Sequence, residues 1–307
     1  MPELKQLRVL RAVRKTGSFS GAADELSYTQ PAVSKIIASL EREIGAVLVD
    51  RETRPIRLTD AGEAIARHAD EVFERLRTAQ AEVQAIADLD SGTLSAGTFS
   101  SAGAAFFVDA LRALRAQHPG IAVSITEGMP SALVDKIRDG DLDLAVVFDF
   151  PEAGEDRGAG LEVHHLLDDP FDAVLPADHA LARAKQVAYA DLAEEDWVLP
   201  DFGPDSPTMK LIGRGCAAAG FEPKIRFRVN DCDMTLAMVA AGEGISFLPR
   251  LMLPRDHGGV CTRPLASDAP IRRIIAVRLS SRYLTPAAER FLLLLGPAAA
   301  EYSGHGG

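Results

Sequence analysis

The chain of 307 residues is too long for one compact core of ordinary size, so we expect several domains. Its hydrophobic share of 47% and charged share of 25% are those of a soluble globular protein, and no apolar run approaches the ~20 residues that cross a bilayer. The first residues carry no export signal, and three cysteines without C-x-x-C spacing argue against a disulfide framework and a zinc site. We therefore expect a cytoplasmic protein with reduced thiols, no membrane segment, no metal and no cofactor.

The net charge of −11 is distributed unevenly along the chain. Residues 1–60 hold ten basic and eight acidic side chains, a net charge of +2, whereas residues 61–307 hold 23 basic and 36 acidic ones, a net charge of −13. A mildly basic head on an acidic body is the asymmetry expected when only the head meets phosphate groups. The charge pattern therefore favours a nucleic-acid contact near the N-terminus.

Two short helices are predicted at the N-terminus. Apolar side chains recur at helical spacing over 4–13, and Gly17-Ser18 interrupts the pattern with a residue able to cap the next helix. The first helix should therefore end near Thr16, and an alanine-rich second helix should occupy 19–26.

A third, longer helix completes a helix-turn-helix pattern. Thr29 is its predicted N-cap, Pro31 is tolerated in the first turn, and Gly45 supplies the C-terminal stop. Its core face consists of apolar side chains at helical spacing, namely Val33, Ile36, Ile37, Leu40 and Ile44. Residues 47–58 then carry three arginines around a proline, which predicts a small basic hairpin.

The stretch over 59–89 is rich in alanine and glutamate, has no proline, and has no glycine after Gly62, so it predicts one long helix. Its apolar positions are separated by 7, 4, 3, 4 and 3 residues and form a heptad seam: Ile65, Val72, Leu76, Ala79, Val83 and Ile86. The alternative is a lone amphipathic helix packed on its own domain, which would need a broader apolar stripe. We therefore expect the helix to pair with a second copy.

Strands and helices alternate beyond a predicted hinge at Asp90-Ser91-Gly92, which implies a parallel sheet flanked by helices. The first series has strands over 94–98, 121–126 and 142–148 and helices over 103–117 and 131–138. The second series has strands over 173–175, 197–199, 225–229 and 245–248 and helices over 208–219 and 231–241. A strand over 274–279 and a helix over 285–295 return to the first series, and the tail from Pro297 onward is expected to fray.

Three segments resemble the N-terminal signature of the LysR-type transcriptional regulators: Gly17-Ser18-Phe19-Ser20-Gly21-Ala22-Ala23, Gln30-Pro31-Ala32-Val33-Ser34 and Leu58-Thr59-Asp60-Ala61-Gly62. Val49 departs from that signature, because the family usually has phenylalanine there. The resemblance and the predicted elements imply an α/β protein with a winged helix-turn-helix over 1–60 and a linker and dimerisation helix over 61–90. A two-lobed effector-binding domain of periplasmic-binding-protein type follows over 91–307, with lobe I at about 91–165 and 268–300 and lobe II at about 166–267.

The resemblance also implies a homodimer or homotetramer that binds promoter DNA and responds to a small-molecule effector, with RNA polymerase as a further candidate partner. A recognition helix reads bases with its N-terminal residues, and Gln30 can pair with adenine while Ser34 can meet several base edges. Arginines of the hairpin would meet phosphates or an adjacent minor groove. The predicted DNA-binding set is Gln30, Pro31, Ser34, Lys35, Arg51, Arg54 and Arg57. The alternative roles are helix capping for the polar residues and a solvated surface for the arginines.

Ligands of two-lobed α/β folds sit near the carboxyl ends of strands, where helix N-termini point inward. The residues that follow the predicted strands form the predicted effector-binding set: Ser100, Ser101, Thr126, Gly128, Phe148, Phe202 and Asn230. The resemblance implies a small organic acid as effector. Acidic residues near the same strand ends offer partners for an amine-bearing or amino-acid effector instead, although helix capping and loop solvation are their commoner roles: Asp149, Asp201, Asp205, Asp231 and Asp233. N-capping by the two serines and core packing of Phe202 are the structural alternatives.

Three other functions fit the sequence less well than a transcriptional regulator. An enzyme is disfavoured because G-x-S-x-G and Walker-type motifs are missing from the sequence, and His164-His165 lack a chelating helical spacing. A solute-binding protein would need an export signal and no helix-turn-helix. A redox sensor would use Cys232 at a helix start, where the helix dipole can lower a thiol pKa, although an inert cysteine is the usual outcome there.

Overall fold

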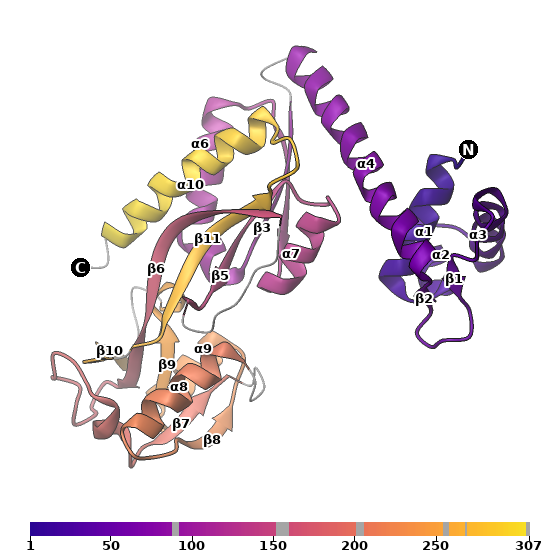
Figure 1. The fold of residues 1–307 in the computed structure, drawn as a ribbon. Helices are drawn as coiled ribbons and strands as arrows, with labels where there is room; N and C mark the ends of the chain where they lie inside the picture. The colour runs from indigo at the N-terminus through magenta and orange to yellow at the C-terminus, as the bar shows by residue number, and fades with distance from the viewer. Residues whose placement is uncertain (88–91, 152–159, 201–205, 254–257, 268, 305–307) are drawn as a thin grey trace. The chain divides into compact units, whose positions relative to one another are not determined.

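The structure is a computed structural model that describes residues 1–87, 92–151, 160–200, 206–253, 258–267 and 269–304. It consists of two compact units, Met1–Ile86 and Ala87–Gly307. The N-terminal unit contains α1 (Leu4–Thr16), α2 (Phe19–Leu26), α3 (Gln30–Ile44), the antiparallel pair β1 (Val49–Asp50) and β2 (Arg57–Leu58), and the long helix α4 (Asp60–Ala87) (Figure 1). These are the elements of a winged helix-turn-helix followed by a linker helix.

Local signals set the ends of the first three helices. Gly17 ends α1 in the left-handed conformation, and the Ser18 hydroxyl accepts a hydrogen bond from the backbone N–H of Gly21 at 2.9 Å. Gly45 ends α3 at a φ of 78°. Thr29 is the N-cap residue of α3, as predicted, although its side chain makes no capping hydrogen bond.

The core of this unit is built from the apolar faces of the three helices and the start of the wing. Its main buried side chains are Val9, Leu10, Val13, Ala22, Val33, Ile37, Leu40, Leu48, Val49 and Ala66. On α3 the fully buried face is narrower than predicted, because Ile36 and Ile44 are only half-buried. Val49, the departure from the family signature, is 1% exposed and therefore packs inside this core.

The C-terminal unit begins with a lobe built on the parallel strands β3 (Thr93–Thr98), β4 (Ala122–Glu127) and β5 (Leu144–Asp149), which we call lobe I. Its helices are α5 (Ser100–Ala102), a π-helix (Gly103–Phe107), α6 (Val108–Gln117), α7 (Pro130–Arg138) and α10 (Pro286–Gly304). Side chains alternate along β5, so α6 and α10 cover one face of the sheet while α7 covers the other. The strand β11 (Ile271–Leu279) joins the sheet antiparallel to β5, so the sheet is mixed rather than wholly parallel as predicted.

Lobe II comprises β7 (Asp196–Leu199), β8 (Lys224–Arg228), β9 (Ser246–Pro249), β10 (Val260–Pro264), α8 (Pro207–Ala218) and α9 (Cys232–Ala240), with 3-10 helices at Tyr189–Leu192 and Arg250–Met252. Its larger core surrounds Trp197, which is fully buried against Phe247 and Phe221. A smaller cluster packs α9 on the other side, around Val174 and Val239.

One strand, β6 (Leu161–Pro176), belongs to both lobes (Figure 1). Its first part pairs with β11 in lobe I, and its last residues pair with β9 and β10 in lobe II. The sequence predicts only 173–175 of it and does not predict β10. The predicted boundary between the lobes at 165/166 falls inside this strand. Because β6 pairs with strands of both lobes, its hydrogen bonds continue from one lobe into the other.

The C-terminal helix α10 continues through Pro297 to Gly304, where the sequence predicts a frayed tail. Proline leaves the carbonyl four residues earlier without its helical donor. That residue is Leu293, whose side chain is 61% exposed, so the carbonyl lies on the solvent side where water can bond to it. Leu295 and Ala299 are fully buried on the opposite side, and their packing holds the helix together.

Candidate DNA-binding surface and effector cavity

The start of α3 presents polar side chains to solvent. Gln30, Pro31 and Lys35 are exposed and Ser34 is half-buried, while Val33, which belongs to the core face of the helix, is fully buried. The capping positions ahead of α3 contain no acidic residue, and none lies in its first turn. The structure therefore brings the four predicted residues of this helix together on one surface that a phosphate backbone can approach.

The three predicted arginines of the wing differ in their contacts. The Arg51 guanidinium donates to a Glu41 carboxylate oxygen at 2.9 Å and lies over the ring of Phe19. The other oxygen of Glu41 accepts the backbone N–H of Leu48 at 3.0 Å, so Glu41, which the sequence analysis missed, ties the wing to α3. Arg54 donates to nearby backbone carbonyls, and Arg57 is exposed. Arg54 and Arg57 thus face solvent more freely than Arg51 does.

The linker helix α4 exposes part of the predicted heptad seam. Val72, Leu76 and Val83 are 40%, 41% and 65% exposed, and Ala79 is exposed as well. Ile65 instead packs against the core of the N-terminal unit, and the side chain of Ile86 lies outside the described residues. Exposed apolar side chains at heptad spacing are what a helix offers to a second helix.

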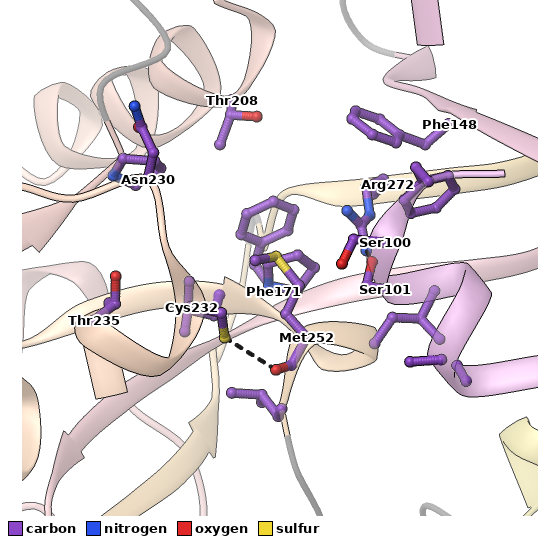
Figure 2. Close-up of a pocket in the computed structure, with 18 of the residues that line it drawn as sticks. Ser100, Ser101, Phe148, Phe171, Thr208, Asn230, Cys232, Thr235, Met252 and Arg272 are labelled. Atoms are coloured by element: carbon purple, nitrogen blue, oxygen red, sulfur yellow. Dashed lines mark hydrogen bonds between the residues drawn. The ribbon is translucent and has the colours of Figure 1, made fainter. Parts of the chain in front are cut away.

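A cavity of about 890 Å³ lies between lobe I and lobe II (Figure 2). Of the predicted effector-binding residues, Ser100, Ser101, Gly128, Phe148 and Asn230 line it. Thr126 does not line it; the chain reaches the cavity one residue later, at Glu127, as side chains alternate between the faces of β4. Phe202 falls outside the described residues.

Arg272 is the central polar residue of the cavity, and the sequence analysis missed it. It is 5% exposed, and its guanidinium donates to Asp169 through Nε at 2.9 Å and Nη2 at 2.6 Å, with Nη2 also 3.0 Å from the Ser101 hydroxyl. Its guanidinium carbon lies 5.0 Å and 4.9 Å from the ring centroids of Phe99 and Phe148, which themselves make an edge-to-face contact. Figure 2 shows Arg272 and both serines on the same side of the cavity.

The Asp169–Arg272 pair also connects the lobes. The two residues face each other across β6 and β11, and the second oxygen of Asp169 accepts the backbone N–H of Leu251 at 3.0 Å. Burial raises the pKa of Asp169, and the Arg272 guanidinium opposes that rise. Burial also lowers the pKa of Arg272, but a guanidinium starts so far above neutral pH that it stays charged. The cavity's only lining arginine is therefore already balanced by a carboxylate within the described residues.

Cys232 lines the cavity at the start of α9, but its surroundings do not activate it. Its thiol donates to the backbone carbonyl of Met252 at 3.2 Å (Figure 2), and burial, reinforced by Asp233 and Asp231, raises its pKa to about 11. The hypothesis that the helix dipole lowers this pKa is wrong, because burial and two adjacent carboxylates outweigh the dipole.

We expect Cys232 to react slowly with alkylating reagents at neutral pH. At pH 7.5 its iodoacetamide modification should be at least about tenfold slower than that of free cysteine, and the rate should keep rising up to a pH of about 11. Mass spectrometry of the peptide that contains Cys232, with free cysteine as the reference, measures both rates. A fast reaction with a midpoint near pH 7 would contradict the raised pKa and restore the redox-sensor hypothesis.

Both parts of the chain match known protein families. Residues 4–63 match the family described as "Bacterial regulatory helix-turn-helix protein, lysR family", and residues 87–300 match the family "LysR substrate binding domain". The HTH-type transcriptional regulator CfxR of Cupriavidus necator is 30% identical, covering 98% of this chain and 93% of that protein. The HTH-type transcriptional regulator YfeR of Shigella flexneri is 29% identical, over 93% of this chain and 91% of that protein.

A solved structure of full-length OxyR from Pseudomonas aeruginosa shares the fold, with a TM-score of 0.68, 24% identity, and coverage of 97% of this chain and 95% of that one. Among the described helices, none combines the length and apolarity that a bilayer crossing requires. These matches confirm the resemblance noted in the sequence: the chain is a DNA-binding transcriptional regulator with an effector-binding domain, and not an enzyme. It belongs to the LysR family of bacterial transcriptional regulators.

Proposed function

We propose that α3 reads the operator in the major groove and that the wing fixes the protein on the DNA backbone. The observation that carries this proposal is the polar start of α3, where Gln30 and Lys35 are exposed beside the half-buried Ser34. Lys35 adds a positive charge there, and Pro31 shapes the first turn. Arg54 and Arg57 contact phosphates or the adjacent minor groove, while Arg51 acts mainly by holding the wing against Glu41.

We further propose that the protein acts in the cytoplasm as a homodimer or homotetramer. The support is the exposed apolar seam of α4, which includes Val72, Leu76 and Val83. Two copies joined through α4 present two recognition helices to separated half-sites. A homo-oligomer bound at a promoter also stands where RNA polymerase binds, which makes the polymerase a candidate partner.

The inter-lobe cavity is the proposed effector site. Its volume of about 890 Å³ suits a small organic molecule. The uncharged residues Ser100, Ser101, Gly128, Phe148 and Asn230 contribute to its lining, and their polar groups can bond to either an organic acid or an amino acid, so they do not select the charge of the effector. An effector that prefers the closed arrangement of the lobes shifts the protein toward that arrangement by its difference in affinity for the two states.

A pair of variants tests the assignment of the DNA contacts. Replacing Gln30 and Ser34 together by alanine removes base contacts, so we expect the preference for the chain's own upstream DNA over a scrambled fragment to fall by about tenfold to a hundredfold. Arg54→Ala removes a phosphate contact, so we expect both fragments to be bound more weakly by the same factor, with a shallower salt dependence. Fluorescence anisotropy titrations at several salt concentrations measure both quantities.

Circular dichroism of each variant shows whether the helices are retained. Unchanged sequence preference in the double variant would overturn the assignment of α3 as the reading helix. A change of preference with Arg54→Ala would overturn the division of roles between helix and wing.

A further inference from the structure

The charged groups around the effector cavity are nearly all acidic. Among the described residues, four carboxylates line it, Asp109, Glu127, Asp231 and Asp233, against the single guanidinium of Arg272. Arg272 is balanced by Asp169, and Asp109 is paired with Arg112 at 3.1 Å. Within the described residues, Glu127, Asp231 and Asp233 have no cationic partner. The field inside the cavity is therefore negative, and it disfavours an anionic ligand.

These three carboxylates come from both sides of the cavity. Glu127 ends β4 in lobe I, whereas Asp231 and Asp233 lie at the start of α9 in lobe II. When the lobes approach each other, like charges from the two sides come closer, which opposes closure. A positive group between them removes that repulsion, so a cationic ligand gains affinity in the closed arrangement.

The N-terminus of α9, which would otherwise attract an anion, is already occupied by the protein's own groups. The Asp231 carboxylate accepts the backbone N–H of Met234 at 2.8 Å, and Asp233 lies in the first turn. A ligand carboxylate placed there would compete with Asp231 for the same N–H groups. This end of the cavity is therefore suited to a ligand's positive charge.

Two further features describe the body of the ligand. The part of the chain that the structure describes places five phenylalanines along the cavity, namely Phe99, Phe148, Phe150, Phe171 and Phe247, and several of them make edge-to-face contacts with one another. Thr208, only 9% exposed, also lines the cavity, and no described residue hydrogen-bonds its hydroxyl. Figure 2 shows that hydroxyl pointing toward the side of Phe148 and Ser100. That hydroxyl can therefore bond to a polar atom of a ligand in the cavity.

We propose that the effector carries a primary ammonium group on an aromatic body. The ammonium group donates to the carboxylates of Glu127, Asp231 and Asp233, and the ring packs among the phenylalanines, whose faces also attract a cation. The Thr208 hydroxyl bonds to a polar atom of the bound molecule. This inference rests on the proposed function of the cavity as the effector site and names the chemical class of the effector.

Three probes with the same ring and chain separate the charge classes: 2-phenylethylamine, L-phenylalanine and 3-phenylpropanoate. We expect calorimetric titration of the full chain to show that both amine-bearing probes bind at least about tenfold more tightly than 3-phenylpropanoate. Asp233→Asn and Glu127→Gln, both at exposed positions, should each weaken 2-phenylethylamine binding by about threefold to tenfold without weakening that of 3-phenylpropanoate. Glu222→Gln, an exposed carboxylate that does not line the cavity, is the matched control and should change neither.

The outcomes separate this inference from the proposed effector site. Binding of 3-phenylpropanoate as tight as that of the amines, weakened by Ser101→Ala, overturns the ammonium preference and keeps the cavity as the effector site. Amine binding that none of the cavity variants changes overturns both. Failure of all three probes to bind overturns the inference of an aromatic amine.

Discussion

Replacing Arg272 by methionine is expected to lower the free energy of unfolding of the C-terminal unit by roughly 3–5 kcal/mol. The substitution removes the partner of Asp169, which is 1% exposed and, among the described residues, then keeps only the backbone N–H of Leu251 as a hydrogen-bond donor. An uncompensated carboxylate at that depth is far more costly than a lost ion pair at the surface. The variant also loses the contacts of the guanidinium with the rings of Phe99 and Phe148.

Urea unfolding followed by fluorescence measures this loss directly, because Trp197 is the only tryptophan of the chain and lies fully buried in lobe II. Arg226→Met is the matched control, since Arg226 is half exposed in its pairs with Asp196 and Glu243 and should cost less than about 1 kcal/mol.

The double variant Asp169→Leu with Arg272→Met removes both buried charges and should recover part of the lost stability. If Arg272→Met costs no more than Arg226→Met, or if the double variant is no more stable than the single one, the buried pair is not what holds this region together.

The substitution Gly62→Ala, which adds one methyl group, is expected to lower the stability of the N-terminal unit and its affinity for DNA. A Cβ atom built there would lie 2.0 Å from the backbone carbonyl oxygen of Leu48, which itself accepts the N–H of Thr59 at 3.0 Å. Backbone on both sides has to move to relieve such a contact, and that movement displaces the wing from α4. We expect Gly62→Ala to cost about 1–3 kcal/mol of stability and at least about tenfold in DNA affinity.

Gly213→Ala is the matched control for that substitution. Gly213 lies inside α8, and a Cβ atom there would meet nothing within 4 Å, so alanine should be neutral or stabilise the helix by about 0.5–1 kcal/mol. Thermal unfolding and anisotropy titrations of both variants give the comparison. Wild-type DNA affinity in Gly62→Ala would show that the wing is not fixed by this close approach.

Helices with a clean periodicity could be predicted from the sequence to within a residue or two. In α3, fully buried Val33, Ile37 and Leu40 recur at helical spacing, and Gly45 marks the end. Most of the strand β6 could not be predicted from local periodicity, because its first part carries polar residues such as His164, His165 and Asp169. Their partners lie on β11, about a hundred residues further along the chain, so a local window cannot show that they are compatible with a sheet.

The prediction of the cavity residues from the sequence was limited in the same way. Ser100 and Ser101 could be predicted because they directly follow a strand and precede a helix. Arg272 could not, since only the pairing of β11 with β6 brings it next to Asp169 and Ser101. The adjacent pair Arg272-Arg273 beside an apolar strand was the available signal, because charged residues at the start of a buried strand need partners. Thr126 was misplaced by one residue, which in a strand means the opposite face.

Because β6 is shared between the lobes, the two lobes are difficult to produce as separate fragments. Without the chain of lobe II, the last residues of β6 would keep Ala173, Val174 and Leu175, now fully buried, on an open strand edge without the partners supplied by β9 and β10. Open apolar edges aggregate. Neither half is therefore expected to express as a soluble fragment, and a recombination that exchanges ligand preference between relatives has to transfer both lobes together.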